Sequence, residues 1–184
     1  MPATATLRRP FVLWFTGLPA AGKTTISTLV GVELEEAGIV VEHLDGDVVR
    51  THLSRGLGFS KEDRDVNVER VAWVASRVAR AGAAVLVSMV SPYTESRQRA
   101  RDLVEQHAAF VEVHVATPLE QCVDRDPKGM YARAYAGELS DFTGVSAPYE
   151  EPVRPELRLE TTGREASACA AEVWSALHTL ALLG

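Results

Sequence analysis

The residue pattern with the clearest chemistry lies near the start of the chain, where glycines, a lysine and a threonine fall at fixed spacing. It fits G-x-x-x-x-G-K-[ST], and its residues are Gly17, Leu18, Pro19, Ala20, Ala21, Gly22, Lys23 and Thr24. Glycines let the backbone turn tightly, so that its N–H groups face a phosphate chain at a helix N-terminus. The lysine then reaches the β- and γ-phosphates, and the threonine hydroxyl is a ligand for Mg²⁺. The motif therefore predicts a site for ATP or GTP.

Two acidic residues, Asp45 and Asp47, follow the second apolar run of the chain. In a parallel sheet this position lies beside the phosphate loop, at the ligand edge. A carboxylate there can orient or deprotonate an acceptor hydroxyl, or it can position Mg²⁺ through water. The chain also lacks the N-K-x-D motif with which GTPases read their base. Together these features favour a kinase.

A few basic residues are spaced to meet an anionic acceptor. Arg64 and Asn67 are three residues apart on a predicted helix and so share a face. With Arg50 and Lys128, Arg64 would form the local basic cluster that a phosphorylated or sulfated ligand requires. The net charge of the 184-residue chain is -6, which argues against a nucleic-acid partner or an anionic membrane.

Short apolar runs alternate with longer amphipathic stretches along the chain. The predicted strands cover residues 11–15, 39–44, 84–90, 110–115 and 157–161. The predicted helices cover residues 24–37, 47–54, 61–81, 95–107, 119–124 and 165–182. This order predicts an α/β fold, a doubly wound and mainly parallel five-stranded sheet with helices on both faces. The ligand should bind beyond the carboxyl ends of the strands.

The chain length suits one domain, so we predict a flexible segment over residues 1–10 and a single domain over residues 11–184. Residues 126–155 contain several glycines and prolines and no strand-like run. An irregular segment of this length inside a compact domain is typical of a lid.

The remaining composition predicts an ordinary cytoplasmic protein. We find no signal peptide and no apolar run long enough to cross a membrane. Cys122 and Cys169 match no metal or redox spacing, which favours buried, reduced thiols. Trp14 and Trp73 lie in apolar stretches, and we expect both to fill the core.

Six segments, in order and with compatible spacing, closely resemble the adenylylsulfate (APS) kinase family. They are GLPAAGKTT (17–25), DGDVVR (45–50), LGFSKEDRDVN (57–67), VSPY (90–93), RDPKGMYARAYAGEL (125–139) and FTGVSAPYEEP (142–152). The resemblance runs from Val12 to about Thr161. It implies a P-loop kinase fold and ATP-dependent phosphorylation of the 3′-hydroxyl of APS, which gives PAPS and ADP in sulfate activation. It also implies a homodimer.

The resemblance assigns roles to individual residues. It implies Asp45 as the catalytic base, with Lys23 and Lys128 neutralising charge on the transferring phosphoryl group. ATP would be held by the phosphate loop, Thr25 and Arg125, and Mg²⁺ by Thr24 and, through water, Asp47. The APS-binding positions would be Asp47, Arg50, Phe59, Arg64, Asn67, Val90, Ser91, Lys128 and Phe142. The rings of Phe59 and Phe142 would stack on the adenine of APS.

Ser91 matches a serine described in the family as a phosphoserine intermediate. A phosphate-loop site already aligns donor and acceptor for in-line transfer, and no adjacent histidine would activate this serine. The residues favour a milder role, a hydroxyl that hydrogen-bonds near APS. The chain also has Thr94 where the family commonly has arginine, which removes a charge near the site.

Two other functions stay open at this point. One is a kinase for another small hydroxyl acceptor, such as a sugar acid or an antibiotic. The other is a non-catalytic nucleotide-binding regulatory domain. Such a domain would be expected to have lost Lys23, Thr24 or Asp45, and all three are present.

Overall fold

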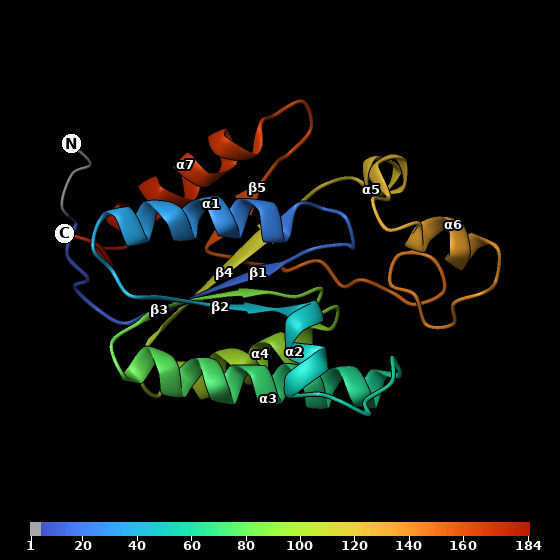
Figure 1. The fold of residues 1–184 in the computed structure, drawn as a ribbon, viewed down its shortest axis with the longest axis horizontal. Coiled ribbons are helices and arrows are strands. Elements are labelled where there is room, and N and C mark those ends of the chain that lie inside the picture. Colours follow the sequence, from blue (N-terminus) through green and yellow to red (C-terminus); the bar gives the residue numbers. More distant parts are fainter. Residues whose placement is uncertain (1–4) are drawn as a thin grey trace.

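The computed structural model describes residues 5–184 and has a parallel β-sheet between two layers of helices (Figure 1). The strands are β1 (Phe11–Thr16), β2 (Val41–Asp45), β3 (Ala84–Ser88), β4 (Ala109–Val115) and β5 (Leu157–Leu159). Their order across the sheet is β2-β3-β1-β4-β5, and every neighbouring pair is parallel. The predicted fold class is confirmed, and each strand bound lies within two residues of its prediction.

Helices cover both faces of the sheet. They are α1 (Lys23–Glu36), α2 (Gly46–His52), α3 (Lys61–Arg80), α4 (Thr94–Val104), α5 (Leu119–Arg125), α6 (Met130–Tyr135) and α7 (Ala166–Thr179). Figure 1 shows α1 and α7 side by side on one face and α3 and α4 on the other. The short helices α2, α5 and α6 lie toward the edge where the strands end. No helix of residues 5–184 is long and apolar enough to cross a membrane.

The central strands are apolar on both sides because helices cover both faces of the sheet. On β1, Phe11, Leu13 and Phe15 pack in the cluster with α1 and α7. Val12 and Trp14 alternate with them and pack in the cluster with α3 and α4. All six residues of β1 are buried, so the strand that leads into the phosphate loop is fixed from both sides.

The expectation that both Trp14 and Trp73 fill the core is correct for one of them. Trp14 is fully buried, whereas 56% of the Trp73 surface is exposed, and the Arg77 guanidinium lies 5.7 Å from its ring. The buried face of α3 is made of small residues: Val68, Val71, Ala72, Ala75 and Ala79. Trp73 follows Ala72 directly, and a step of one residue on a helix turns the side chain away from the sheet.

The segment predicted to lack regular structure contains one short helix, α6. Tyr131 and Ala134 are buried and three residues apart, which places them on the same side of α6. The Asp126 carboxylate accepts a hydrogen bond from the Ala132 N–H at 3.1 Å and so stabilises the start of this helix. Six residues are too few for a recognisable hydrophobic period, which is why the sequence did not reveal α6.

The described part of the N-terminal segment pairs with the other end of the chain. The Thr6 N–H donates to the Gly184 carbonyl at 3.1 Å, and the Arg8 N–H donates to the Leu182 carbonyl at 3.0 Å. Ala5 is buried in the same region. Residues 1–4 of the segment that we predicted to be flexible lie outside the described residues.

Candidate active site

The phosphate loop joins β1 to α1 and depends on glycine at its first position. A Cβ atom on Gly17 would lie 2.6 Å from the Val115 carbonyl oxygen, which is closer than real contacts of this kind. The Lys23 ammonium lies across the loop and donates to the carbonyls of Gly17 at 3.0 Å and Leu18 at 2.8 Å. Burial lowers the pKa of Lys23 to about 8. This cation is therefore held over the loop by carbonyl groups, and it forms no ion pair with a carboxylate of residues 5–184.

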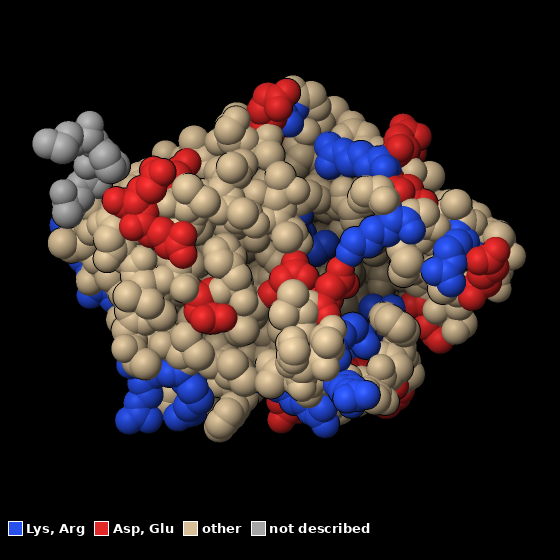
Figure 2. Space-filling view, viewed as in Figure 1, with Lys and Arg blue, Asp and Glu red and all other residues tan. Residues whose placement is uncertain are grey.

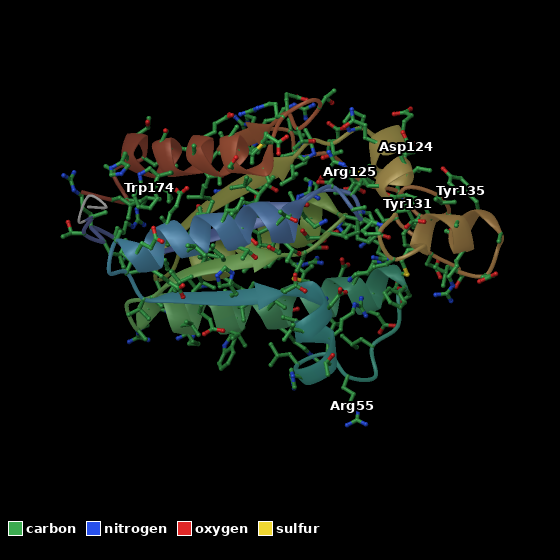
Figure 3. The ribbon with its side chains drawn as sticks, turned by 45° about the horizontal axis from the view of Figure 1, so that its top comes forward. Arg55, Asp124, Arg125, Tyr131, Tyr135 and Trp174 are labelled. Atoms are coloured by element: carbon green, nitrogen blue, oxygen red, sulfur yellow. The ribbon has the colours of Figure 1, made fainter. Side chains whose placement is uncertain are left out.

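The outer side of the loop is supported by α5 and α6. Arg125 Nη1 donates to the Ala21 carbonyl at 3.3 Å, and the Tyr131 hydroxyl donates to the Pro19 carbonyl at 3.1 Å. Figure 3 shows Arg125 and Tyr131 on the side of their helices that faces the loop, while Tyr135 lies on the outer side of α6. Two side chains from distant parts of the sequence thus hold the carbonyls of Pro19 and Ala21 and so support the shape of the loop.

Carboxylates and cations from three elements converge beside the loop. The Thr24 hydroxyl donates to Asp45 Oδ2 at 2.8 Å, and the Asp47 N–H donates to Asp45 Oδ1 at 3.0 Å. The second bond is the N-terminal cap of α2. The ammonium of Lys128 pairs with the Asp47 carboxylate, which raises the pKa of Lys128. The structure therefore places the predicted acidic pair next to the loop.

The predicted basic residues lie around an exposed aromatic ring on the other side of α2. The Arg50 guanidinium stacks 4.2 Å from the centre of the Phe59 ring, and the Arg64 guanidinium lies 5.5 Å from it. Arg50 Nη1 donates to the Gly58 carbonyl at 3.0 Å, and Arg64 Nε donates to the Phe59 carbonyl at 2.8 Å. Partial burial lowers the pKa of both guanidinium groups, which stay charged at neutral pH.

Residues of the predicted lid reach the same place. Arg64 Nη2 donates to the Asp141 carbonyl at 2.5 Å. The neighbouring Phe142 ring is buried and meets Tyr131 edge-on at 5.1 Å. Asn67 lies one turn after Arg64, and its buried Oδ1 has no hydrogen-bond partner within the described residues. An unpartnered buried oxygen is costly, so it indicates a place where a ligand donates a hydrogen bond.

One cavity of about 620 Å³ connects these groups. Figure 2 shows this part of the surface, where Lys and Arg side chains gather with acidic ones around a hollow. The predicted site residues that line the cavity are Pro19, Ala20, Gly22, Lys23, Thr24, Thr25, Asp45, Asp47, Arg50, Phe59, Arg64, Asn67, Val90, Ser91, Lys128 and Phe142. Those that do not line it are Gly17, Leu18, Ala21 and Arg125. Leu18 lines a second hollow of about 440 Å³, Gly17 and Ala21 belong to the backbone of the phosphate loop, and Arg125 supports that loop through the Ala21 carbonyl.

Ser91 faces the interior more than the sequence suggested. Its Oγ accepts a hydrogen bond from Trp14 Nε1 at 3.1 Å, and the residue is only 3% exposed. Arg97 is a further residue near this site that no sequence motif indicated, and it donates to the Ser91 carbonyl at 2.8 Å. Nothing in the sequence distinguishes Arg97 from the other arginines of α4. Its contact with the Ser91 turn arises only when the fold brings that turn beside α4.

The oxygens beside the loop fit a magnesium ion that arrives with a nucleotide. Within residues 5–184, no three His, Cys, Asp or Glu side chains are grouped as a metal site. Mg²⁺ is usually held by one or two protein oxygens together with phosphates and water. The hydroxyl of Thr24 and the carboxylate of Asp47, which both line the cavity, provide that number and kind of oxygen.

Comparisons with known proteins agree with this geometry. A family model described as adenylylsulphate kinase matches residues 9–160. An adenylyl-sulfate kinase of Chloroflexus aurantiacus is 46% identical over 180 residues, which are 98% of this chain and 95% of that protein. A probable adenylyl-sulfate kinase of Pseudomonas aeruginosa is 52% identical over 151 residues, which are 82% of this chain and 69% of that protein.

A solved structure is similar over the same extent. The APS kinase of Mycobacterium tuberculosis, in complex with AMPPNP and APS, superposes with a TM-score of 0.90 and 43% identity. The match covers 92% of this chain and 98% of that one. The matches to the family model, the two relatives and the solved structure cover most of the sequence. They include the phosphate loop on one side of the cavity and the Arg50–Phe59–Arg64 cluster on the other. This chain therefore belongs to the adenylylsulphate kinase family.

Proposed function

We propose that this enzyme transfers the γ-phosphoryl group of ATP to the 3′-hydroxyl of APS and so produces PAPS and ADP. The observation that carries the proposal is the cavity of about 620 Å³, which has the phosphate loop on one side and the Arg50–Phe59–Arg64 cluster on the other. Asp45 joins the two sides, because its carboxylate contacts Thr24 and its residue caps α2, which carries Arg50.

The phosphate loop suits the triphosphate of ATP. Backbone N–H groups at the start of α1 and the Lys23 ammonium would hold the phosphate oxygens. The Thr24 hydroxyl would bind Mg²⁺ directly, and Asp47 would do so through water. When bound, the ion would neutralise negative charge on the β- and γ-phosphates. Arg125 lies behind the loop on α5, where it would stand near the base of ATP.

The opposite side of the cavity suits an anionic nucleotide. Arg50 and Arg64 would neutralise the phosphosulfate group, because guanidinium groups bind such oxygens in pairs of hydrogen bonds. The exposed ring of Phe59 and the ring of Phe142 offer aromatic faces for adenine. The unpartnered Oδ1 of Asn67 would accept a hydrogen bond from an amino or hydroxyl group of APS.

The chemical step needs only residues that already line the cavity. The acceptor oxygen forms a bond to the γ-phosphorus, and the bond between that phosphorus and the bridging oxygen of ADP breaks. Asp45 takes the proton of the attacking hydroxyl. Lys23 and Lys128 would balance the charge on the transferring group, Lys128 after leaving Asp47. Ser91 would donate a hydrogen bond near APS, since its Oγ is buried and already bonded to Trp14.

The decisive experiment measures PAPS and ADP when the protein is mixed with APS and Mg·ATP. We expect both products in equal amounts, and no product with Lys23→Met. Lys61→Met is the matched control, because Lys61 is exposed on α3 and its ion pairs within the described residues are with Asp65 and Glu95, which lie outside the cavity lining. ADP release with a sugar acid or an aminoglycoside but not with APS would overturn the proposal. Tight APS binding without turnover would favour the regulatory alternative.

We also propose that residues 126–155 act as a lid, that the enzyme is a homodimer, and that it works in the cytoplasm. The lid is supported by Lys128, Asp141 and Phe142, which line the cavity from this segment. The family resemblance supports the homodimer, which light scattering of the purified protein would test. Free, buried cysteines agree with a reducing compartment.

A further inference from the structure

The guanidinium of Arg97, on α4, contacts the acceptor side of the cavity from behind. The residue is 3% exposed and does not line the cavity. Nη1 donates to the Ser91 carbonyl at 2.8 Å, and Nη2 donates to the Glu150 carbonyl at 2.7 Å and to Thr94 Oγ1 at 3.3 Å. Nε donates to Glu112 Oε1 at 2.8 Å. One buried side chain thus joins four separate parts of the fold.

The turn that receives the first of these bonds has an unusual backbone. Ser91 has a φ of +39°, in the left-handed region that residues with a side chain seldom adopt. Val90, Ser91 and Pro92 all line the cavity. Such a conformation persists only where the surroundings impose it. Here Arg97 holds the Ser91 carbonyl, and Trp14 Nε1 holds its Oγ at 3.1 Å.

The hydrogen bond from Trp14 has a chemical consequence for Ser91. Indole nitrogen is a donor only, so the serine oxygen must be the acceptor in this bond. Among the described residues, the one acceptor for the hydroxyl hydrogen is the Met89 carbonyl, at a long distance of 3.5 Å. It is therefore available to a ligand in the cavity, provided that the turn keeps its conformation.

The residues that follow the proposed lid are attached to the same turn. The Glu150 N–H donates to the Pro92 carbonyl at 2.8 Å, and its carboxylate accepts from the Thr94 N–H at 2.8 Å. The Glu150 carbonyl accepts from Arg97. Arg97 therefore fixes the Ser91 turn and the returning end of the lid segment with one planar group.

We propose that Arg97 is a positioning residue for the acceptor substrate. It keeps the turn of residues 90–92 in the conformation that directs the Ser91 hydroxyl into the cavity, and it does so without touching the substrate. The identity of the acceptor rests on the proposed function, whereas the link between Arg97, the turn and Trp14 does not.

Arginine is the residue that this position requires. Its five donors lie in one plane and point in several directions, and it stays charged when buried. Glu112, on β4, balances the charge from within the core. Lysine has a compact ammonium on a flexible stem, and it cannot reach Glu112 and both carbonyls with the same geometry.

Arg101, one turn further along α4, provides a matched control. It lies 3.8 Å from the same Glu112 carboxylate and forms two hydrogen bonds of 2.8 Å with Glu156. Its hydrogen bonds and ion pairs within the described residues all go to groups outside the cavity lining. A change at Arg101 therefore disturbs the same charge cluster without loosening the Ser91 turn.

The kinetic test compares Arg97→Lys with Arg101→Lys. We expect Arg97→Lys to raise KM for APS by about 10-fold or more, because bonds that fix the turn are lost, while KM for ATP changes less than about twofold. Arg101→Lys should leave both values within about twofold of the parent. An unchanged KM for APS in Arg97→Lys, or an equal rise in Arg101→Lys, would overturn the proposal.

A second test needs no substrate and so separates this inference from the proposed function. The indole N–H of Trp14 gives its own nuclear magnetic resonance signal, which Trp14→Phe identifies by its loss. Arg97→Lys should shift this signal in the free protein, and Arg101→Lys should not. An unshifted signal in a folded Arg97→Lys protein would refute the proposal, even if wild-type protein makes no PAPS.

A double variant covers the case in which Arg97→Lys does not fold. Arg97→Gln with Glu112→Gln replaces the buried charges with two amides that can bond to each other. This protein keeps the core neutral but loses the donor group at the Ser91 carbonyl. We expect the same shift of the Trp14 signal and the same rise in KM for APS. If both the signal and KM for APS stay unchanged in the folded double variant, the proposal is refuted.

Discussion

The Thr24 hydroxyl donates a hydrogen bond of 2.8 Å to the Asp45 carboxylate, which links the start of α1 to the cap of α2. The other oxygen of Asp45 accepts the N–H of Asp47 at 3.0 Å. The Asp45 carboxylate is thus oriented from both sides, by α1, which follows the phosphate loop, and by α2, which carries Arg50. This arrangement fixes the direction from which Asp45 can take a proton.

We predict that Asp45→Asn lowers kcat by about 10²- to 10⁴-fold, because an amide cannot accept the proton of the acceptor hydroxyl. The affinity for an ATP analogue should change less than about threefold, since the phosphate cradle and the hydrogen bond with Thr24 are retained. Steady-state rates and calorimetric titration provide the two values. Asp102→Asn, on the exposed side of α4, is the control. A loss of ATP binding equal to the loss of kcat would instead assign Asp45 to the nucleotide's metal ion.

The affinity for ATP should fall as the pH rises above about 8. Burial lowers the pKa of Lys23 to about 8, so the free protein loses this proton while other lysines keep theirs. Only the protonated form attracts phosphate, and therefore Kd should rise toward tenfold per pH unit above that value. Titration calorimetry from about pH 7 to about pH 9.5 measures the change.

The same titration has an internal check. Binding above about pH 8 must take up a proton, so the measured heat should depend on the ionisation enthalpy of the buffer. Lys23→Met should bind weakly at every pH and show no such dependence. A constant Kd across the range for the wild-type protein would contradict the assignment of Lys23.

Arg64→Lys should weaken APS binding and leave ATP binding unchanged. The lysine keeps the charge but loses the fork of donors that meets the Phe59 and Asp141 carbonyls. We expect KM for APS to rise about 10- to 100-fold, which corresponds to one or two lost charged hydrogen bonds. Arg70→Lys is the matched control, because Arg70 lies on the same helix and donates to the Leu53 carbonyl, which is outside the cavity. A normal KM for APS would remove Arg64 from the acceptor site.

Lys128→Met should lower kcat by about 10²-fold with almost no change in stability. The pair between Lys128 and Asp47 is exposed, at 66% and 74% of the two side chains, and such pairs contribute about 0–1 kcal/mol. The melting temperature should therefore stay within about 4 °C of the parent. Lys61→Met is again the control. If thermal unfolding shifts by much more while kcat holds, the ion pair is structural and Lys128 takes no part in transfer.

The sequence was most informative where local patterns decide structure. Five short apolar runs and the amphipathic stretches between them were enough to predict every strand and six of the seven helices. The spacing of Arg64 and Asn67 correctly placed both residues on one side of α3, facing one cavity. These features depend on periods of two to four residues, which a single sequence displays directly.

The sequence could not reveal relationships that the topology creates. Glu112 and His114 are polar residues in an otherwise apolar strand, and both are buried in β4. Glu112 is buried because Arg97 comes from α4 to pair with it. The N–H of Trp14 meets Ser91 across 77 positions of sequence, and no local pattern encodes that contact.

The position of β1 has a consequence for folding while the chain is being synthesised on the ribosome. This strand is made first but lies between β3 and β4, whose last residue is Val115. Its hydrogen-bonding partners on both sides are therefore synthesised long after it, and parallel pairing over such separations is slow. Until then, the apolar run from Phe11 to Phe15 has no sheet to join, and nascent chains of this kind depend on protection from aggregation. The phosphate loop, which follows β1 directly and packs against Val115, therefore cannot complete its packing until β4 has been made.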